Sequence, residues 1–292
     1  MNTTRQIAEQ ISAASGEPFE PSSTRTVGGG CINSAMVLSD GDRCWFVKLN
    51  RAEMLAMFEA ESDGLSAMAG SASIRVPLPL CTGTVGTQAF IVMEYIPLGS
   101  RRSGSAAAAG EQLAAMHRTT AASFGWHRDN TIGSTAQSNR RHKDWIGFWR
   151  TERLGFQLDL AARHGYGATL AKRGEQLLDR FPALIDHAPI PSLLHGDLWG
   201  GNFGTSDDGS PVIFDPACYF GDREADIAMT ELFGGFGADF YAAYQGVWPL
   251  DHGYRTRKTL YNLYHILNHL NLFGSGYLAQ AEDMIDRLLS FS

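Results

Sequence analysis

Two carboxylates and one carboxamide stand at the ends of two short apolar runs in the second half of the chain. The first run ends in His-Gly-Asp at Asp197, Asn202 follows five residues later, and the next apolar run ends in Asp215. Phosphoryl transfer to an alcohol needs these groups, because one carboxylate accepts the hydroxyl proton while an amide oxygen and a second carboxylate hold magnesium. A capped turn would explain each residue alone, but the ordered set favours phosphoryl transfer.

A lysine and a glutamate in the first third of the chain point to the same chemistry. Lys48 is the one charged residue of "WFVKL", a predicted strand, and Glu61 lies in the apolar stripe of a helix predicted over residues 53–69. An ionised carboxylate that faces a core needs a cation beside it. We therefore expect Lys48 and Glu61 to pair and to face nucleotide phosphates, as in kinases. The alternative is that Glu61 reaches solvent at the edge of the stripe while Lys48 extends its amine to water.

Two further segments fit a nucleotide site. Backbone amides can approach phosphate closely at three consecutive glycines, Gly28, Gly29 and Gly30. A plain hairpin turn explains the same glycines. Adenine would meet the backbone at the end of a buried strand, around Met93, Glu94, Tyr95 and Ile96. The chain contains no G-x-x-x-x-G-K-[ST] motif, which excludes a P-loop nucleotide-binding protein.

Three residues are expected to support the Asp197 loop, and one cysteine is a candidate regulator. Asp226 lies on a predicted helix whose expected N-cap is Asp222, and it can accept hydrogen bonds from the loop that contains His195. Arg223 either supports the same loop or makes only a structural ion pair. Cys31 directly follows the glycines, and we hypothesise that its oxidation inhibits the protein reversibly. A small, inert, buried thiol is the alternative.

Composition excludes several classes of function. The chain has 292 residues and a net charge of −7, which argues against a nucleic-acid partner because phosphate contacts need clustered Lys and Arg. No apolar stretch approaches the ~18 residues that a membrane span needs, and the N-terminus does not resemble a signal peptide. None of the four cysteines forms a C-x-x-C pair, so no zinc site is expected. We expect a cytoplasmic protein without a membrane partner, either monomer or dimer.

The order of predicted elements divides the chain into two domains. Residues 1–96 read as strands with helices and form an N-terminal nucleotide-binding lobe. Residues 97–292 read mostly as helices and form a C-terminal catalytic and substrate-binding lobe. The fold class is therefore α+β.

Several segments together resemble the fructosamine kinase family. They run from about residue 24 to 245, and the specific ones are "HGDLWGGN" and "DPACYFGDREADIAM"; the others include "GGGCIN", "WFVKLN", "FIVMEYI" and "FGWHRDNTIGSTAQSN". The resemblance implies a protein-kinase-like two-lobe fold. The small lobe would have an antiparallel sheet and one helix, and the large lobe would be mainly helical. The family's usual Ser before the second loop glycine is Gly200 here.

The resemblance also implies an activity and roles for named residues. The family uses ATP and magnesium to phosphorylate a ketosamine, such as a ribulosamine or a fructosamine, at the third carbon of the sugar, which makes the adduct labile and serves deglycation. By position, Asp197 is the base, Asn202 and Asp215 are metal ligands, Trp199 contacts the sugar, and Lys48 with Glu61 orients phosphates.

Two other functions stay open at this point. A bare "HGD…N…D" pattern also fits kinases of aminoglycosides and other amino alcohols. A pseudokinase scaffold that binds nucleotide is the second alternative, although a scaffold has no physical need for all five polar residues. The short distance between Asp215 and the next predicted helix leaves no activation segment, which makes a regulated protein kinase a poor fit.

Overall fold

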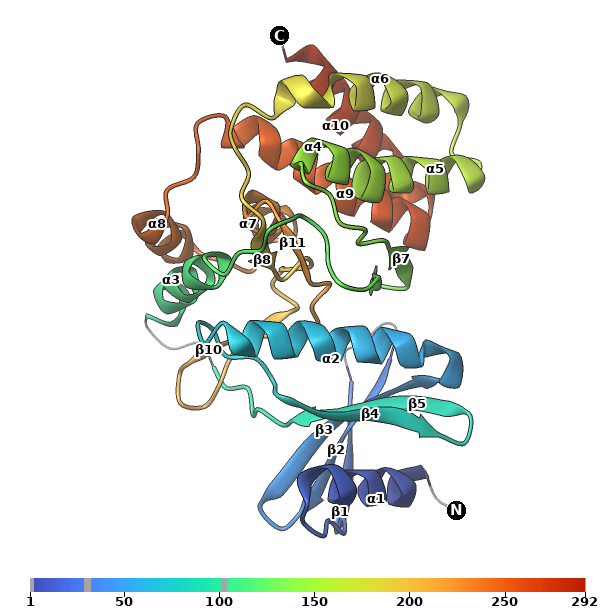
Figure 1. Cartoon of the computed structure of the whole chain (residues 1–292), viewed down its shortest axis with the longest axis vertical. Helices are drawn as coiled ribbons and strands as arrows, with labels where there is room; N and C mark the ends of the chain where they lie inside the picture. Colours follow the sequence, from blue (N-terminus) through green and yellow to red (C-terminus); the bar gives the residue numbers. More distant parts are fainter. Residues whose placement is uncertain (1–2, 29–32, 101–103, 292) are drawn as a thin grey trace.

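The computed structural model describes residues 3–28, 33–100 and 104–291. The predictions for Gly29, Gly30 and Cys31 lie outside the described residues. The chain forms two lobes stacked along the long axis of the molecule, with a sheet in the N-terminal lobe and helices in the C-terminal lobe (Figure 1). This confirms the predicted fold class.

The small lobe is built on a five-stranded antiparallel sheet in the order β1-β2-β3-β5-β4. Its strands are β1 Ser23–Val27, β2 Ser34–Asp40, β3 Arg43–Arg51, β4 Pro79–Val85 and β5 Gln88–Glu94. Side chains alternate between the two faces of a strand. Val47 and Phe90 therefore pack on one face with the helix α1, whereas Ile91 and Met93 pack on the other face with α2.

The sheet is covered on both faces, so the expectation of one helix in this lobe was wrong. The helix α1 (Thr3–Ser15) buries Ile7 and Ile11 against one face, and α2 (Leu55–Gly70), after the short 3-10 turn η1 (Ala52–Met54), covers the other. In Figure 1 the sheet lies between these two helices, and α2 lies next to the large lobe. The sequence signal of α1 is weak, because only three of its residues are buried.

The chain passes from one lobe to the other shortly after β5. That strand ends at Glu94, and the amide of Gly99 already donates to the carbonyl of Thr205 in the large lobe (2.8 Å). The division of the chain into domains after residue 96 stays a prediction.

The large lobe combines helices with three two-stranded ribbons. Its helices are α3 Ser105–His117, α4 Trp145–Phe148, α5 Phe156–Arg163, α6 Ala168–Leu184, α7 Glu224–Leu232, α8 Ala238–Val247, α9 Tyr254–Phe273 and α10 Leu278–Ser290. A π-helical stretch, η2 (Trp149–Gly155), joins α4 to α5, and a 3-10 turn, η3 (Ser275–Tyr277), precedes α10. The ribbons pair β6 Asn130–Ile132 with β7 Thr135–Gln137, β8 Ser192–Leu194 with β11 Tyr219–Gly221, and β9 Phe203–Thr205 with β10 Pro211–Ile213.

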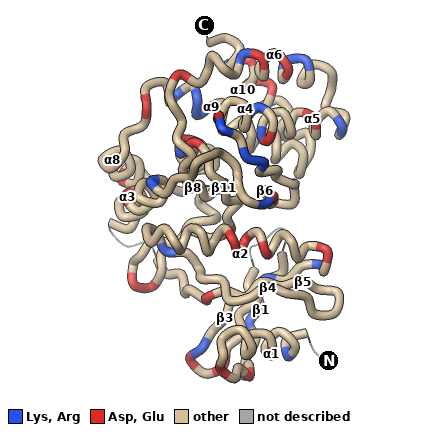
Figure 2. The backbone as a smooth tube through the Cα atoms, in the orientation of Figure 1, with Lys and Arg blue, Asp and Glu red and all other residues tan. Residues whose placement is uncertain are grey.

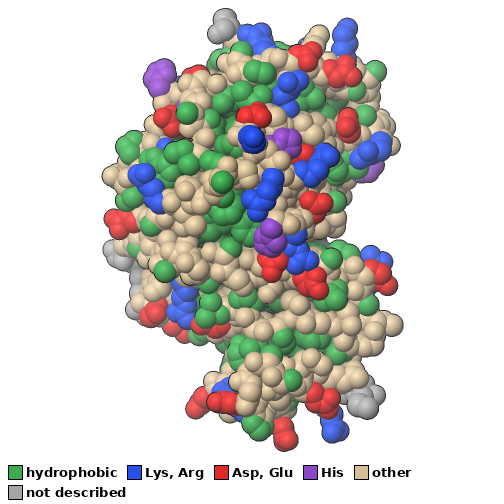
Figure 3. Space-filling model, viewed as in Figure 1, with side chains coloured by type: hydrophobic (Ala, Val, Ile, Leu, Met, Phe, Trp, Pro, Cys, Tyr) green, Lys and Arg blue, Asp and Glu red, His purple; other side chains and the backbone are tan. Residues whose placement is uncertain are grey.

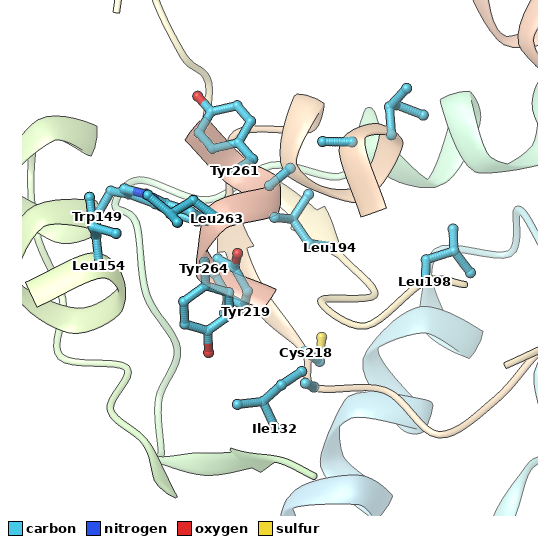
Figure 4. Packing of buried hydrophobic residues seen from close by; sticks show 14 of the residues in the cluster. Ile132, Trp149, Leu154, Leu194, Leu198, Cys218, Tyr219, Tyr261, Leu263 and Tyr264 are labelled. Atoms are coloured by element: carbon cyan, nitrogen blue, oxygen red, sulfur yellow. The ribbon is translucent and has the colours of Figure 1, made fainter. Parts of the chain in front are cut away.

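The core of the large lobe holds the ribbons against the helices. Figure 4 shows Trp149, Tyr261 and Tyr264 from the helical side lying toward Leu194 and Tyr219 from the ribbon β8–β11. Trp149 and Tyr264 have ring centroids 5.5 Å apart. The aromatic residues Trp149 of η2 and Tyr261 and Tyr264 of α9 therefore belong to the core of this lobe. No helix of the described residues is long and apolar enough to cross a membrane.

Candidate active site

Two backbone crossings bring the polar residues of the second half together. The apolar runs that precede Asp197 and Asp215 form β8 and β10, which belong to different ribbons. The amide of Phe214 donates to the carbonyl of Asn202 (3.1 Å), and the amide of Ala217 donates to the carbonyl of His195 (2.9 Å). The two strand ends therefore meet although the strands do not pair with each other.

The side chain of Asn202 lies at the centre of this meeting point. Its Nδ2 atom donates to the backbone carbonyl of Asp197 (2.9 Å), to the Asp197 carboxylate (3.3 Å) and to the carbonyl of Asp215 (3.4 Å). Because the nitrogen serves these acceptors, the oxygen Oδ1 remains to bind a cation. The amide oxygen of Asn202 and the carboxylate of Asp215 are oxygen ligands of the kind that magnesium prefers, so the residues fit the predicted metal.

Asp215 is held in an unusual backbone conformation. Its φ is +58°, and Ala72 is the other non-glycine residue with a positive φ in the described part of the chain. Such residues persist where the surrounding structure fixes them, and they concentrate at functional sites. The Asp215 carboxylate is 47% exposed and accepts a hydrogen bond from Lys48. One end of the carboxylate is therefore fixed while the side chain still reaches solvent.

Lys48 joins Asp215 to the small lobe. It lies on the α2 side of β3, and its Nζ donates to Oε1 of Glu61 on α2 at 2.6 Å. The side chains of Lys48 and Glu61 are 9% and 10% exposed. The ion pair predicted from the sequence is therefore present, and the alternative in which both residues reach solvent was wrong. The Lys48 ammonium is the cation that faces Asp215 across the junction of the lobes.

The environment of Asp197 favours a proton acceptor that works near neutral pH. Burial raises the pKa of Asp197 to about 7, although the hydrogen bond from Asn202 opposes this shift and the charge of Asp226 adds to it. A general base works best when its pKa lies near the operating pH.

A buried carboxylate fixes the loop from beneath. Asp226, on α7, accepts hydrogen bonds from the amides of His195 (2.7 Å) and Gly196 (2.8 Å), and His117 lies 3.2 Å from the same carboxylate. Gly196 has a φ of +82°, and a Cβ there would overlap the carbonyl of Ala217. The loop can adopt this path only with glycine at that position.

His195 supports the loop through its side chain as well. Its Nε2 donates to the carbonyl of Phe214 (2.9 Å), and its Nδ1 accepts from the amide of Asp197 (3.3 Å). Burial lowers the pKa of His195, which keeps the ring neutral with the proton on Nε2. His195 therefore ties the Asp197 loop to the segment that leads to Asp215.

Arg223 does not contact this loop in the hydrogen bonds that the structure gives it. Its guanidinium donates to the hydroxyl of Tyr244 (3.2 Å) and to the carbonyls of Trp248 and Pro249, beyond the end of α8. An ion pair with Asp251 at 3.7 Å completes its surroundings. Of the two readings of Arg223, the structural one fits this geometry, because the residue reaches Asp226 only indirectly, through Tyr244 and His117.

Trp199 begins a row of aromatic side chains that leads away from Asp197. It is 39% exposed, and its ring centroid lies 6.4 Å from that of Phe233, which is 40% exposed. Neighbouring rings continue the row, which we call the aromatic strip: Trp199, Phe233, His269, Phe273 and Tyr277. No sequence pattern selects Phe233 or His269 as candidates, because helical spacing alone cannot show that the residue after α7 and the residues of α9 bring these rings together.

The predicted adenine segment continues β5 into the crossing between lobes. Met93 and Ile96 are buried, and Tyr95 accepts a hydrogen bond from Arg25 (2.9 Å). The Glu94 amide donates to the carbonyl of Leu78 (2.8 Å). Because that amide is occupied, Tyr95 and Ile96 are the better candidates for backbone contacts with adenine. Gly28, at the end of β1, is exposed.

Known proteins resemble this chain over most of its length. The model of the family described as fructosamine kinase matches residues 3–291. "Probable ketoamine kinase slr1563" of Synechocystis is 47% identical, over 97% of this chain and 96% of that protein. "Protein-ribulosamine 3-kinase, chloroplastic" of Arabidopsis thaliana is also 47% identical, over 90% of this chain and 82% of that protein.

Solved structures show the same fold. A crystal structure from Haemophilus somnus, assigned to fructosamine-3-kinase, superposes with a TM-score of 0.87 at 29% identity, over 97% of this chain and 96% of that one. Choline kinase LicA of Streptococcus pneumoniae, at 14% identity, shares the kinase-like fold with a TM-score of 0.64 over 99% of both chains. The match of the family model over nearly the whole length shows that this chain belongs to the fructosamine kinase family.

Proposed function

We propose that this protein transfers the terminal phosphoryl group of ATP to the hydroxyl on the third carbon of a ketosamine, such as a ribulosamine or a fructosamine on an amine or a protein lysine. One observation carries the proposal. Asn202 donates to the Asp197 carboxylate and to the backbone carbonyl of Asp215, and the carboxylate of Asp215 accepts from Lys48 of the Lys48–Glu61 pair. These contacts occur in a chain that is 47% identical to a protein-ribulosamine 3-kinase.

Asp197 is proposed to accept the proton of the attacking hydroxyl. The substrate oxygen forms a bond to the terminal phosphorus, the bond from that phosphorus to the bridging oxygen of ATP breaks, and the hydroxyl proton moves to the Asp197 carboxylate. A pKa of about 7 lets this carboxylate take the proton near neutral pH. The amides of His195 and Gly196 donate to the carboxylate of Asp226, which holds the loop of Asp197 in place.

The remaining polar residues are proposed to hold the nucleotide. Asn202 and Asp215 would bind magnesium, which neutralises charge on the phosphate oxygens when it is present. Lys48 supplies a fixed positive charge beside Asp215, and Glu61 keeps its amine from turning away. Gly28 and its neighbours would approach the phosphates, and the backbone of Tyr95 and Ile96 would bind adenine.

The aromatic strip is proposed to bind the acceptor. Aromatic rings present flat apolar faces, which suit the C–H face of a sugar, and attract a nearby amine cation. Trp199 is two residues from Asp197 and would contact the sugar, while Phe233 and the rings beyond it would lie along the amine-bearing part. We also infer a role in deglycation, because phosphorylation at the third carbon makes the adduct labile. A cytoplasmic setting is a separate part of the proposal.

A panel of acceptors tests the proposal. Ribulosyl-lysine, fructosyl-lysine and an aminoglycoside are offered in parallel with ATP and magnesium, and ADP release is measured with Asp197→Asn as the blank. NMR of the product then locates the phosphate. We expect turnover of a ketosamine and phosphate on its third carbon. Turnover of the aminoglycoside alone would favour an amino-alcohol kinase, and ATP binding without turnover of any acceptor would favour a pseudokinase.

A further inference from the structure

One arginine of the large lobe contacts two acidic residues of α2. Nη1 of Arg128 donates to Asp63 (2.8 Å), and Nη2 donates to Glu59 (2.9 Å). His127 lies 3.2 Å from the same Asp63 carboxylate. Figure 2 shows acidic positions along α2 and a basic position beside β6, across the junction of the lobes. In Figure 3 acidic, basic and histidine side chains lie next to one another at this level.

The segment that carries Arg128 is also fixed to the residues that follow Asp215. Asn130 donates from Nδ2 to the carbonyl of Cys218 (2.8 Å), and Gln137 donates from Nε2 to the carbonyl of Ala217 (3.1 Å). The amides of Gly125 and Phe220 donate to each other's carbonyls, both at 2.9 Å. The segment 124–139 therefore links α2 to the strand end that bears the Asp215 carboxylate.

Buried side chains make this link stiff. Asn139 donates to the carbonyl of Arg128 (3.1 Å) and accepts from the guanidinium of Arg153 (2.6 Å). Arg153 is fully buried and belongs to the π-helical stretch η2. Such stretches are frequent at functional sites. A second contact joins the same parts, since a Cβ on Gly64 of α2 would lie 3.0 Å from Cβ of Cys218.

The two carboxylates held by Arg128 flank the glutamate of the Lys48 pair. Residues three or four apart share a helix face, whereas residues two apart point in very different directions. Glu59 and Asp63 therefore face the large lobe together, and Glu61 between them points to Lys48. Fixing the first two residues fixes the rotation of α2 about its axis, and with it the direction of Glu61.

We propose that Arg128 is a positioning residue for phosphoryl transfer, which holds α2 in the rotation that keeps Glu61 on Lys48. Contacts within the fold thereby hold a helix whose position protein kinases control. This inference rests on the proposed kinase reaction. Both carboxylates and Arg128 are partly exposed, at 41%, 38% and 29%. Exposed ion pairs contribute little to the free energy of unfolding. We therefore expect a substitution at Arg128 to change the orientation of α2 more than the stability of the protein.

The first test compares Arg128→Gln with a matched control. Arg173→Gln removes an ion pair with Asp286 whose side chains are similarly exposed, at 41% and 44%, on helices far from α2. We expect Arg128→Gln to lower kcat roughly 3- to 10-fold, the range that two partly exposed ion pairs can supply, with little change in the KM for the acceptor. Arg128→Lys should restore part of the loss, because an ammonium can pair with one carboxylate but lacks the fork that reaches two. Arg173→Gln should match the wild type.

A double-mutant cycle shows whether Arg128 acts through Glu61. In a Glu61→Gln background the Arg128→Gln change should have almost no further effect on kcat, because the group that it positions is gone. The proposal would be overturned if the double variant lost kcat by the product of the two single factors. It would also be overturned if Arg128→Gln had the same kcat as Arg173→Gln. If Arg128 had only a structural role, Arg128→Gln would lower the melting temperature. Its effect on kcat would then multiply with that of Glu61→Gln.

Hydrogen exchange separates this proposal from the proposed function, because it needs no substrate. Amides of α2, residues 55–70, should exchange faster in Arg128→Gln than in the wild type or Arg173→Gln. Unchanged exchange in α2 would contradict the positioning role even if a ketosamine is phosphorylated. If the acceptor proves to be another alcohol, the proposed function fails but the proposal for Arg128 can still be tested. The double-mutant cycle of Arg128 and Glu61 is then measured with that acceptor.

Discussion

Asn202 donates one hydrogen bond to the backbone carbonyl of Asp197 at 2.9 Å and another to the Asp197 carboxylate at 3.3 Å. The nitrogen of the carboxamide therefore serves the proposed base, and its oxygen remains for the cation. This arrangement separates two tasks that lie only a few ångströms apart. A change at Asp197 should impair proton acceptance without removing the residues that bind the nucleotide.

Asp197→Asn should abolish most turnover while it preserves nucleotide binding. The substitution keeps the size of the side chain and removes its ability to accept a proton, and loss of a general base lowers rates by ~10²–10⁴. Single-turnover kinetics and ATP titration with magnesium measure the two properties separately. A variant with the wild-type rate constant would show that Asp197 is not the base.

The activity of the wild-type protein should depend on the protonation of Asp197. Since burial raises its pKa to about 7, the carboxylate is largely protonated below that pH and cannot accept the hydroxyl proton. We expect kcat/KM to fall about tenfold per pH unit below about 7 and to level off above it. The residual rate of Asp197→Asn serves as the control, because it should lack this dependence. A level profile for the wild type down to about pH 5 would contradict the assignment.

Asp226→Asn should destabilise the protein and slow it. An amide offers one oxygen, but His195, Gly196 and His117 all approach the carboxylate, so a buried donor loses its acceptor. Leaving a buried donor without its acceptor lowers the free energy of unfolding by about 3 kcal/mol. Urea unfolding at pH 7 would measure this change. Asp283→Asn, in an exposed ion pair with Arg287 on α10, is the control and should change little.

The loss caused by Asp226→Asn should shrink in acid. Burial raises the pKa of Asp226, but hydrogen bonds from His117 and Gly196 outweigh it and hold the pKa below its ordinary value. The carboxylate therefore stabilises the fold above the ordinary Asp pKa, and this stabilisation disappears as the pH falls through the lower folded-state value. An equal difference between wild type and variant at pH 7 and in strong acid would refute this account.

Gly200→Ser should reduce activity in this chain, although serine is the residue expected from the resemblance. A Cβ at Gly200 would lie 2.9 Å from Cα of Gly235 and 3.0 Å from the carbonyl oxygen of Gly234. The loop after α7 would have to shift, and Phe233, which begins that loop, would move from Trp199. We expect a higher KM for the acceptor and little change for ATP, with Gly246→Ser, at a position with open space, as the control. Unchanged kinetics would show that the loop accommodates the side chain.

The polar residues of the site could be read from the sequence because their spacing is local. Asp197 and Asn202 belong to one loop, and a carboxylate within an apolar helical stripe required a cation, which identified Lys48 as the partner of Glu61. The strands β3 and β5, the helix α2 and the helical character of the large lobe followed from local patterns for the same reason. The helix α1 and the strand β4 were not predicted, because α1 buries only three of its residues and β4 buries only Val85.

The tertiary structure alone decided which distant segments meet. No pattern of residues showed that Arg128 reaches Glu59 and Asp63, that Arg223 belongs to the end of α8, or that Phe233 and His269 continue the row that starts at Trp199. Periodicity reports which face of an element is buried, and it carries no information about the element that covers that face. The sequence therefore determined the chemistry of the groups, whereas the packing of α2, α7 and α9 determined which of them act together.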